Sequence, residues 1–327
     1  MKAKERVIRA LEFRGPDRVP RCILHKPTKK ISDYLRIMFK FRNDIMATSF
    51  VYRRKKITKT KSRDVWGAVW TSFGNKGEVT ESPLSDWSGL EKLKAPEYIN
   101  NFGVNLIKMT RFFAGNKFLI GNLPDMIFSR CHYLRGFTNF MEDLYDEPEN
   151  IKKLVWIIAE NNIKLIDKYA ELKVDGVIGA DDLGLQTSLM ISPSMWREIF
   201  KPAYKAMIER AHQKGMKFIL HSCGYIIDVI EDFIEIGLDC LQCDQQDNMG
   251  IENLNDRFGG RISFFSPTDI QTTLSTNDEQ KISEKAEQLV KTLGSHKGGL
   301  IAKAYPSPKD IGVEEKSVLK MFEAFSK

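Results

Sequence analysis

The chain alternates short apolar, β-branched runs with longer amphipathic segments, and this alternation limits its possible folds more than any other feature. Eight runs qualify as strands: 19–25, 47–52, 118–125, 176–182, 218–224, 240–246, 262–269 and 300–305. Segments with helical periodicity lie between them, for example at 149–172 and 194–215. Strands that alternate with helices form βαβ units and a parallel sheet. Eight such units predict a single (β/α)₈ barrel domain over residues 1–327.

One segment breaks the alternation. Residues 64–84 are rich in aromatic residues and glycine, and we interpret them as a β-hairpin insertion over one mouth of the barrel. A doubly wound open sheet is the alternative architecture, but the glycine-rich phosphate-binding fingerprint that such sheets usually carry is absent from the sequence. The barrel is therefore the preferred fold.

Composition narrows the functional classes. No apolar run reaches the roughly 18 residues needed to span a bilayer, so we expect no membrane partner. The N-terminal segment lacks the apolar core of a signal peptide, and the five cysteines are an odd number. We therefore expect a cytoplasmic protein with reduced thiols.

The net charge of +7 is concentrated in residues 52–63, which read YRRKKITKTKSR. Such a run is usually a solvated loop, and its functional alternative is a docking patch for an acidic protein or a phosphate-bearing cofactor. Zinc-finger spacing and RNA-binding aromatic signatures are both missing from the sequence, which argues against a nucleic-acid partner.

The barrel prediction tells where to look for a site, because active sites in this fold lie at the C-terminal ends of the strands. Polar residues are concentrated at or just beyond these ends. We expect substrate contacts from His25, Gln186, Gln245 and Asp269, and a catalytic role for Tyr305.

The fifth predicted strand ends in His221-Ser222-Cys223-Gly224. Side chains alternate along a strand, so His221 and Cys223 point to the same side and can reach one ion. An imidazole and a thiolate suit zinc, and a catalytic zinc takes three protein ligands. Cys243, at the end of the next strand, is the expected third ligand, with Asp244 and Tyr305 as weaker candidates. Cys240 faces the opposite side and is interpreted as packing.

Two adjacent carboxylates, Asp181 and Asp182, end the fourth predicted strand. They could orient a substrate, act as a base or supply a hard metal ligand. For one of the two, the structural alternative is a helix cap or a turn residue. Further along, Ser192 and Pro193 predict the start of a helix.

Several motifs together resemble the uroporphyrinogen decarboxylase superfamily. They are KERVIRALEFRGPDRVP, DVWGAVW, PLSDWSGLEKL, DGVIGADDLGLQTSLMISPSMWREIFKP, HSCGYIIDVIEDFIEIGLDCLQ, FGGRISFFSPTDIQTTL and GGLIAKAYPS. The resemblance spans nearly the whole chain and is strongest to the methyltransferase branch. It implies a (β/α)₈ barrel, bound zinc, and methyl transfer to or from a corrinoid carried by a partner protein.

The resemblance also bears on single residues. Zinc methyltransferases of the superfamily use an H-x-C pair, which corresponds to His221 and Cys223, and a later cysteine near the end of the last strand. This chain reads LIAKAYPSP there, so Cys243 is the substitute that the resemblance offers. Decarboxylases of the superfamily open with an arginine-rich segment, where this chain has RCILHKPTKK.

The functional hypothesis is therefore a zinc-dependent methyltransferase that acts with a corrinoid protein on a small methylated substrate, or on a thiol or folate acceptor. In either direction Asp181 or Asp182 would orient the substrate or manage its proton. Two alternatives are a tetrapyrrole decarboxylase without metal and a barrel without catalysis that binds a corrinoid or a protein partner.

Overall fold

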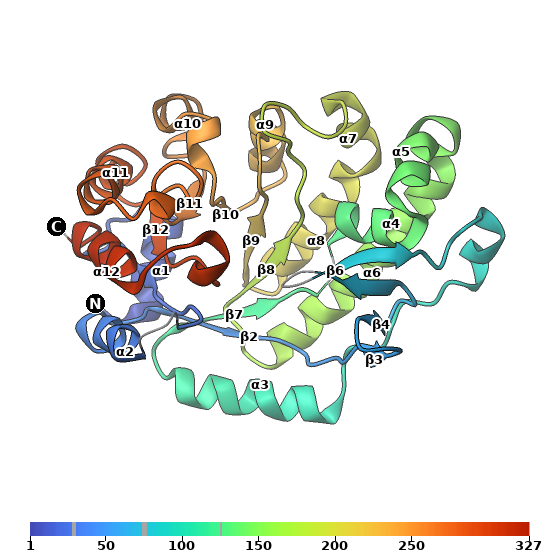
Figure 1. The fold of residues 1–327 in the computed structure, drawn as a ribbon, viewed down its shortest axis with the longest axis horizontal. Helices are drawn as coiled ribbons and strands as arrows, with labels where there is room; N and C mark the ends of the chain where they lie inside the picture. The colour runs from blue at the N-terminus through green and yellow to red at the C-terminus, as the bar shows by residue number, and fades with distance from the viewer. Residues whose placement is uncertain (28–30, 74–76, 125, 327) are drawn as a thin grey trace.

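The computed structural model describes residues 1–27, 31–73, 77–124 and 126–326. Within them, eight parallel strands form an α/β barrel in the order β1-β12-β11-β10-β9-β8-β7-β2 (Figure 1). Their bounds are β1 (Arg21–Cys22), β2 (Ile45–Thr48), β7 (Phe118–Asn122), β8 (Gly176–Ala180), β9 (Lys217–His221), β10 (Cys240–Gln242), β11 (Ser263–Ser266) and β12 (Leu300–Lys303). The backbone N–H of Asp44 donates to the carbonyl of Arg21 at 2.9 Å and links β2 to β1. The predicted (β/α)₈ architecture is confirmed.

Helices follow the strands and surround the barrel (Figure 1). The α-helices of the described residues are α1 (Ala3–Leu11), α2 (Ile31–Lys40), α3 (Asn101–Ala114), α4 (Ile127–Arg135), α5 (Phe137–Asp146), α6 (Pro148–Glu171), α7 (Pro193–Ile199), α8 (Lys201–Gln213), α9 (Ile227–Glu235), α10 (Ile251–Phe258), α11 (Glu279–Thr292) and α12 (Glu315–Ala324). The 3₁₀ helices are η1 (Trp87–Lys92), η2 (Gln246–Asn248), η3 (Leu274–Thr276) and η4 (Pro308–Ile311). Helix α7 begins as predicted, because Ser192 Oγ accepts a hydrogen bond from Met195 N at 3.2 Å and Pro193 is the first helical residue.

The barrel interior is packed with side chains from alternate strand positions, as the period of two requires. Helix α1 contributes to this interior cluster and closes the end where the strands begin. The cluster consists of Val7, Ala10, Leu11, Ile45, Phe118, Ile120, Ile219, Cys240, Phe265 and Ile301. Cys240 is therefore a packing residue as predicted, but it faces the barrel interior, on the same side as His221 and not on the opposite side.

The insertion is larger than the predicted hairpin. In the described part of the chain it is a four-stranded antiparallel sheet of β3 (Lys55–Lys56), β4 (Lys61–Arg63), β5 (Val69–Ser72) and β6 (Gly77–Glu81). The hairpin expected at 64–84 corresponds to β5 and β6, and the basic run supplies the other two strands. Exposed lysines on the outer strand β3 discourage pairing with another sheet edge, which explains part of the positive charge structurally.

Asp64 joins this sheet to the barrel. Its carboxylate accepts from Trp70 Nε1 at 2.9 Å and from Arg130 Nη1 of α4 at 2.7 Å. Asp125, the last residue of the predicted third strand, lies outside the described residues. No helix among the residues that are described is both long and apolar enough to cross a membrane.

Candidate metal centre at the barrel mouth

The candidate site lies where β8 and β9 end, at the C-terminal mouth of the barrel. His221 is the last residue of β9, and the sheet register pairs it with Ala180 of β8 on one side and Gln242 of β10 on the other. Asp182 and Cys223 each lie two residues beyond one member of the Ala180–His221 pair. Because side chains alternate along extended chain, both continue on the same face as His221.

Three metal-binding groups converge there. One ligand atom each from Asp182, His221 and Cys223 can be chosen so that all lie within 4.8 Å of one another. His221 Nε2 lies 3.4 Å from Cys223 Sγ and 3.5 Å from Asp182 Oδ1. Tetrahedral zinc with bonds of about 2.0–2.3 Å separates neighbouring donors by about 3.5 Å. The donor set and these two spacings therefore fit zinc.

Close contact between two loops fixes this arrangement. Cys223 N donates to Asp182 Oδ1 at 2.9 Å, so the loop after β8 is bonded directly to the loop after β9. Gly184 and Gly224 face each other: a Cβ on Gly224 would lie 2.3 Å from the Gly184 carbonyl oxygen, and Gly224 also has a φ of +80°. The glycine after Cys223 in the sequence is thus required by packing and by backbone conformation.

The two adjacent carboxylates have separate surroundings. The side chain of Asp182 is 57% exposed, whereas Asp181 is fully buried. Asp181 accepts from Phe128 N at 2.9 Å and from Ser129 N at 2.7 Å, both in the first turn of α4, and it also accepts from the Tyr204 hydroxyl. Burial raises the pKa of Asp181. Asp181, which follows β8, therefore caps the N-terminus of α4, whereas Asp182 stays exposed at the mouth.

The sulfur of Cys223 is partly buried and lies near two negatively charged side chains. Burial raises the pKa of its thiol, and the neighbouring carboxylates of Asp182 and Asp244 raise this pKa further. Asp244 is itself buried and accepts from Lys303 Nζ at 2.9 Å and from Gln242 Nε2 at 2.8 Å. Carboxylates around a sulfur atom favour a cation at this position.

Cys243 is placed differently from what strand order suggested. Gln242, not Cys243, is the register partner of His221, so Cys243 points to the other face of the sheet. There it is buried in the cluster between strands and helices, and its Sγ lies 3.2 Å from Ser266 Oγ. Among the described residues, Asp182 and not Cys243 completes the group of three.

Two of the expected substrate-binding residues have structural partners. His25 is buried, and its Nε2 lies 2.8 Å from Glu315 Oε2, which joins the loop after β1 to α12. Asp269 is buried and accepts from Gln271 N at 2.8 Å and from Thr272 N at 2.9 Å in its own loop. Neither is a member of the three-donor group.

Three other predicted residues lie in loops after the strands. Gln245 Oε1 accepts from Gly224 N at 2.9 Å and so supports the Cys223 loop. Gln186 is exposed in the loop after β8. Tyr305 follows β12, and burial, then the charges of Asp244 and Cys223, raise the pKa of its phenol.

Sequence reasoning missed a group of aromatic side chains beside Asp182. Tyr133 of α4 contacts Trp70 of the insertion edge-on, with ring centroids 4.8 Å apart, and also His132, at 4.3 Å. Burial, followed by the charge of Arg130, lowers the pKa of His132 to about 4, while Asp182 acts in the opposite direction. From the sequence, His132 and Tyr133 could have been assigned together to one helix, but nothing there links them to Asp182.

Comparison with known proteins identifies the family of this chain. Residues 69–304, more than half of the chain, match the family model described as "Uroporphyrinogen decarboxylase (URO-D)". The chain belongs to the uroporphyrinogen decarboxylase family. The matched region contains the mouth residues of β8, β9 and β10. Among curated protein sequences, none matches the chain with significance.

One of two solved structures with a similar chain path supports the barrel fold. A methyltransferase from Methanosarcina mazei has a TM-score of 0.74 at 17% identity, with 99% of this chain and 98% of that chain covered. A D-psicose 3-epimerase from Clostridium cellulolyticum H10 has a TM-score of 0.47 at 11% identity, with coverage of 93% and 96%. At 17% identity the first likeness establishes the fold alone.

Proposed function

We propose that this member of the uroporphyrinogen decarboxylase family is a zinc-dependent methyltransferase that exchanges a methyl group between a small substrate and a corrinoid carried by a partner protein. The observation that carries the proposal is the convergence of Asp182, His221 and Cys223 at the barrel mouth, with donor spacings suited to zinc. The fold likeness to the Methanosarcina mazei methyltransferase adds support.

In this proposal each mouth residue has a distinct task. Asp182, His221 and Cys223 hold the metal and leave a fourth position for substrate. Zinc bound there would supply Lewis acidity, which either activates an acceptor thiol or polarises the leaving atom of a methyl donor. Tyr305, which lies near Asp244 and Cys223 in the loop after β12, would orient the substrate.

Other residues keep that arrangement rigid. Asp181 fixes the first turn of α4, and this helix carries the aromatic residues next to Asp182. The buried Lys303–Asp244 ion pair lies near the Cys223 sulfur, and its two charges act on the pKa of that thiol in opposite directions. Gln186, on the exposed loop after β8, is available to contact a substrate entering the mouth.

Metal content tests the proposal. The chain is purified without chelator, and its zinc is quantified by mass spectrometry and located by anomalous scattering in crystals. We expect about one equivalent in the wild type and a loss of affinity of about 100-fold or more in Asp182→Asn, His221→Ala and Cys223→Ser. Cys243→Ser is the matched control, because Cys243 lies outside the three-donor group. Equal, negligible zinc in every protein would exclude the proposed mechanism.

The name of the matching family model favours one second candidate, the decarboxylation of a tetrapyrrole. That reaction predicts carbon dioxide release from uroporphyrinogen. Because it needs no metal, its rate should not fall when His221→Ala or Cys223→Ser removes the zinc. Methyl transfer from a corrinoid protein to a thiol, lost in the same two variants, separates the candidates.

A further inference from the structure

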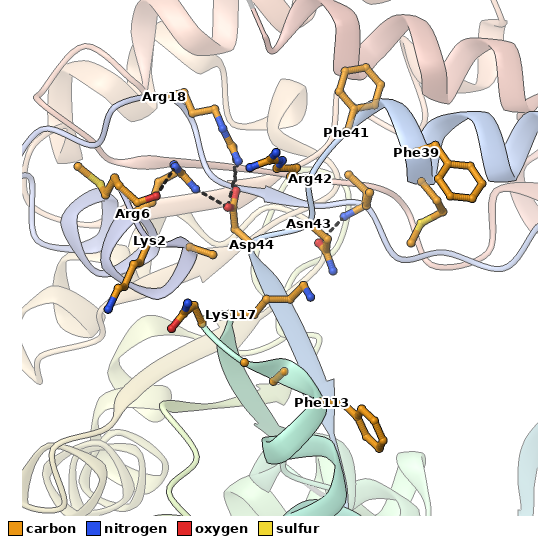
Figure 2. A pocket seen from close by; sticks show the side chains of 17 residues that line it. Lys2, Arg6, Arg18, Phe39, Phe41, Arg42, Asn43, Asp44, Phe113 and Lys117 are labelled. Atoms are coloured by element: carbon orange, nitrogen blue, oxygen red, sulfur yellow. Dashed lines mark hydrogen bonds and ion pairs between the residues drawn. The ribbon is translucent and has the colours of Figure 1, made fainter.

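A groove of about 850 Å³ opens at the opposite end of the barrel from the mouth. It lies between the start of α1, the end of α2 and the end of α3, beside the first residues of β2 and β7. Figure 2 shows aromatic rings and cationic groups among its lining side chains. Neither belongs to the proposed metal centre.

The floor of the groove is an ordered set of charges. Asp44 is 1% exposed and accepts from Arg6 Nη1 at 2.6 Å and from Arg18 Nη1 at 2.7 Å, as Figure 2 shows. Arg6 also donates from Nη2 to Asp17 Oδ2 at 2.8 Å. These bonds fix the two guanidinium groups, so the floor cannot rearrange freely.

A third arginine, Arg21, lies behind this floor near Arg18 and Asp44, although it does not line the groove. Arg21 is 8% exposed, its guanidinium lies 5.3 Å from the ring centroid of Phe41, and its Nε has no hydrogen-bond partner among the described residues. Burial, followed by the charge of Arg18, lowers the pKa of Arg21 to about 10. Arg6 and Arg18 share the carboxylate of Asp44, and Arg21 adds a further positive charge nearby.

The rim of the groove adds further cationic side chains. Lys2, Arg42 and Lys117 line the groove, and none of them has an ion-pair partner within the described residues. Two aromatic rings accompany them: Phe39 of α2 is 86% exposed, and Phe113 of α3 is 67% exposed. Exposed phenyl rings beside unpaired cations are costly in water and suit an amphipathic anion.

We propose that this groove binds a phosphate ester with an apolar or aromatic body, its phosphate at the Arg42 and Lys117 side chains and its body against Phe39 and Phe113. A phosphate monoester carries a charge of about −1.5 to −2 at neutral pH, and its oxygens accept several charge-assisted hydrogen bonds at once. The same chemistry occurs in soluble alkyl or aryl phosphates and in phospholipid headgroups.

Titration calorimetry on the full chain tests the site with inorganic phosphate and hexyl phosphate as probes. We expect saturable binding of hexyl phosphate at one site, about tenfold or more tighter than inorganic phosphate because the alkyl chain covers the rings. The vesicle arm compares sedimentation with phosphatidylcholine vesicles that contain or lack phosphatidylglycerol. Binding in either arm identifies the source of the phosphate, and no binding in both arms overturns the proposal.

Variants of the exposed rim separate binding from folding. Arg42→Ala/Lys117→Ala should weaken whichever interaction is found by about tenfold or more. Phe39→Ala/Phe113→Ala should weaken hexyl phosphate without changing inorganic phosphate. The control Arg53→Ala/Lys56→Ala removes the same charge from the insertion, outside the groove. Equal loss in the control would mean unspecific charge attraction and would reject the site.

This inference does not depend on the proposed function. His221→Ala, which should lose zinc, should keep its affinity for hexyl phosphate. Conversely, Arg42→Ala/Lys117→Ala should keep its zinc. Loss of hexyl phosphate binding in His221→Ala would place the ligand at the mouth and refute the groove assignment.

Discussion

The barrel mouth and the groove at the other end of the barrel are built on the same plan with opposite charge. At the mouth, Asp181 is buried and fully engaged while its neighbour Asp182 is exposed. At the groove, Asp44 is buried between arginines while Arg42 is exposed without an ion-pair partner among the described residues. In both regions a satisfied buried group holds the fold, and the exposed neighbour is the one we propose to meet a ligand: a cation at the mouth and an anion at the groove.

The largest effect should come from the buried charge of the groove. Asp44→Ala should lower the free energy of unfolding by about 3–5 kcal/mol, because it leaves the guanidinium groups of Arg6 and Arg18 without their shared carboxylate. Urea denaturation followed by circular dichroism measures this. Asp17→Ala is the matched comparison, with an expected loss of about 1 kcal/mol, since the Asp17 side chain is 41% exposed. Equal effects of the two variants would contradict the division into floor and surface.

Removing the buried carboxylate at the mouth should lower the free energy of unfolding somewhat less. Asp181→Ala removes the acceptor for two backbone N–H groups of α4 and for the Tyr204 hydroxyl, so we expect a loss of about 2–4 kcal/mol in the free energy of unfolding. Asp182→Ala should change stability by no more than about 0.5 kcal/mol and yet abolish zinc binding. If Asp182→Ala unfolds the protein and Asp181→Ala does not, the assigned roles are reversed.

Titration of His132, near the mouth, should make the free energy of unfolding depend on pH. The pKa of His132 in the folded protein, about 4, lies below the ordinary value of about 6.5, so the unfolded chain binds its proton first as the pH falls. The stabilising contribution is complete above pH ~6.5 and decreases toward pH ~4, by about 3 kcal/mol in total. Unfolding of wild type and His132→Gln across this range measures it. A parallel decrease in both proteins would show that His132 is not the cause.

The smallest stability change should occur at the groove rim. Arg42→Ala/Lys117→Ala should change the free energy of unfolding by no more than about 0.5 kcal/mol, because neither side chain has an ion-pair partner within the described residues. Thermal unfolding measures this, and with added hexyl phosphate the wild type alone should be stabilised. If the variant is much less stable than the wild type without ligand, Arg42 and Lys117 stabilise the folded protein instead of being available for a ligand.

The sequence predicted the fold well because its signals are local. Eight apolar runs, the Ser192–Pro193 helix start and the shared direction of His221 and Cys223 each depend on a few neighbouring residues. The insertion was underestimated for a related reason. A run as basic as 52–63 has no apolar alternation, so nothing local marks it as strand, and only pairing with β5 makes β4 part of a sheet.

The sequence by itself determined that an imidazole and a thiol project together from one strand end, because the period of two is a property of the strand alone. The third residue beside His221 and Cys223 was decided by tertiary structure. Whether Asp182 or Cys243 joins His221 depends on how β8 and β10 are registered against β9, and a shift of one residue would exchange their faces. Register is fixed by packing across the whole barrel, and no single segment encodes it.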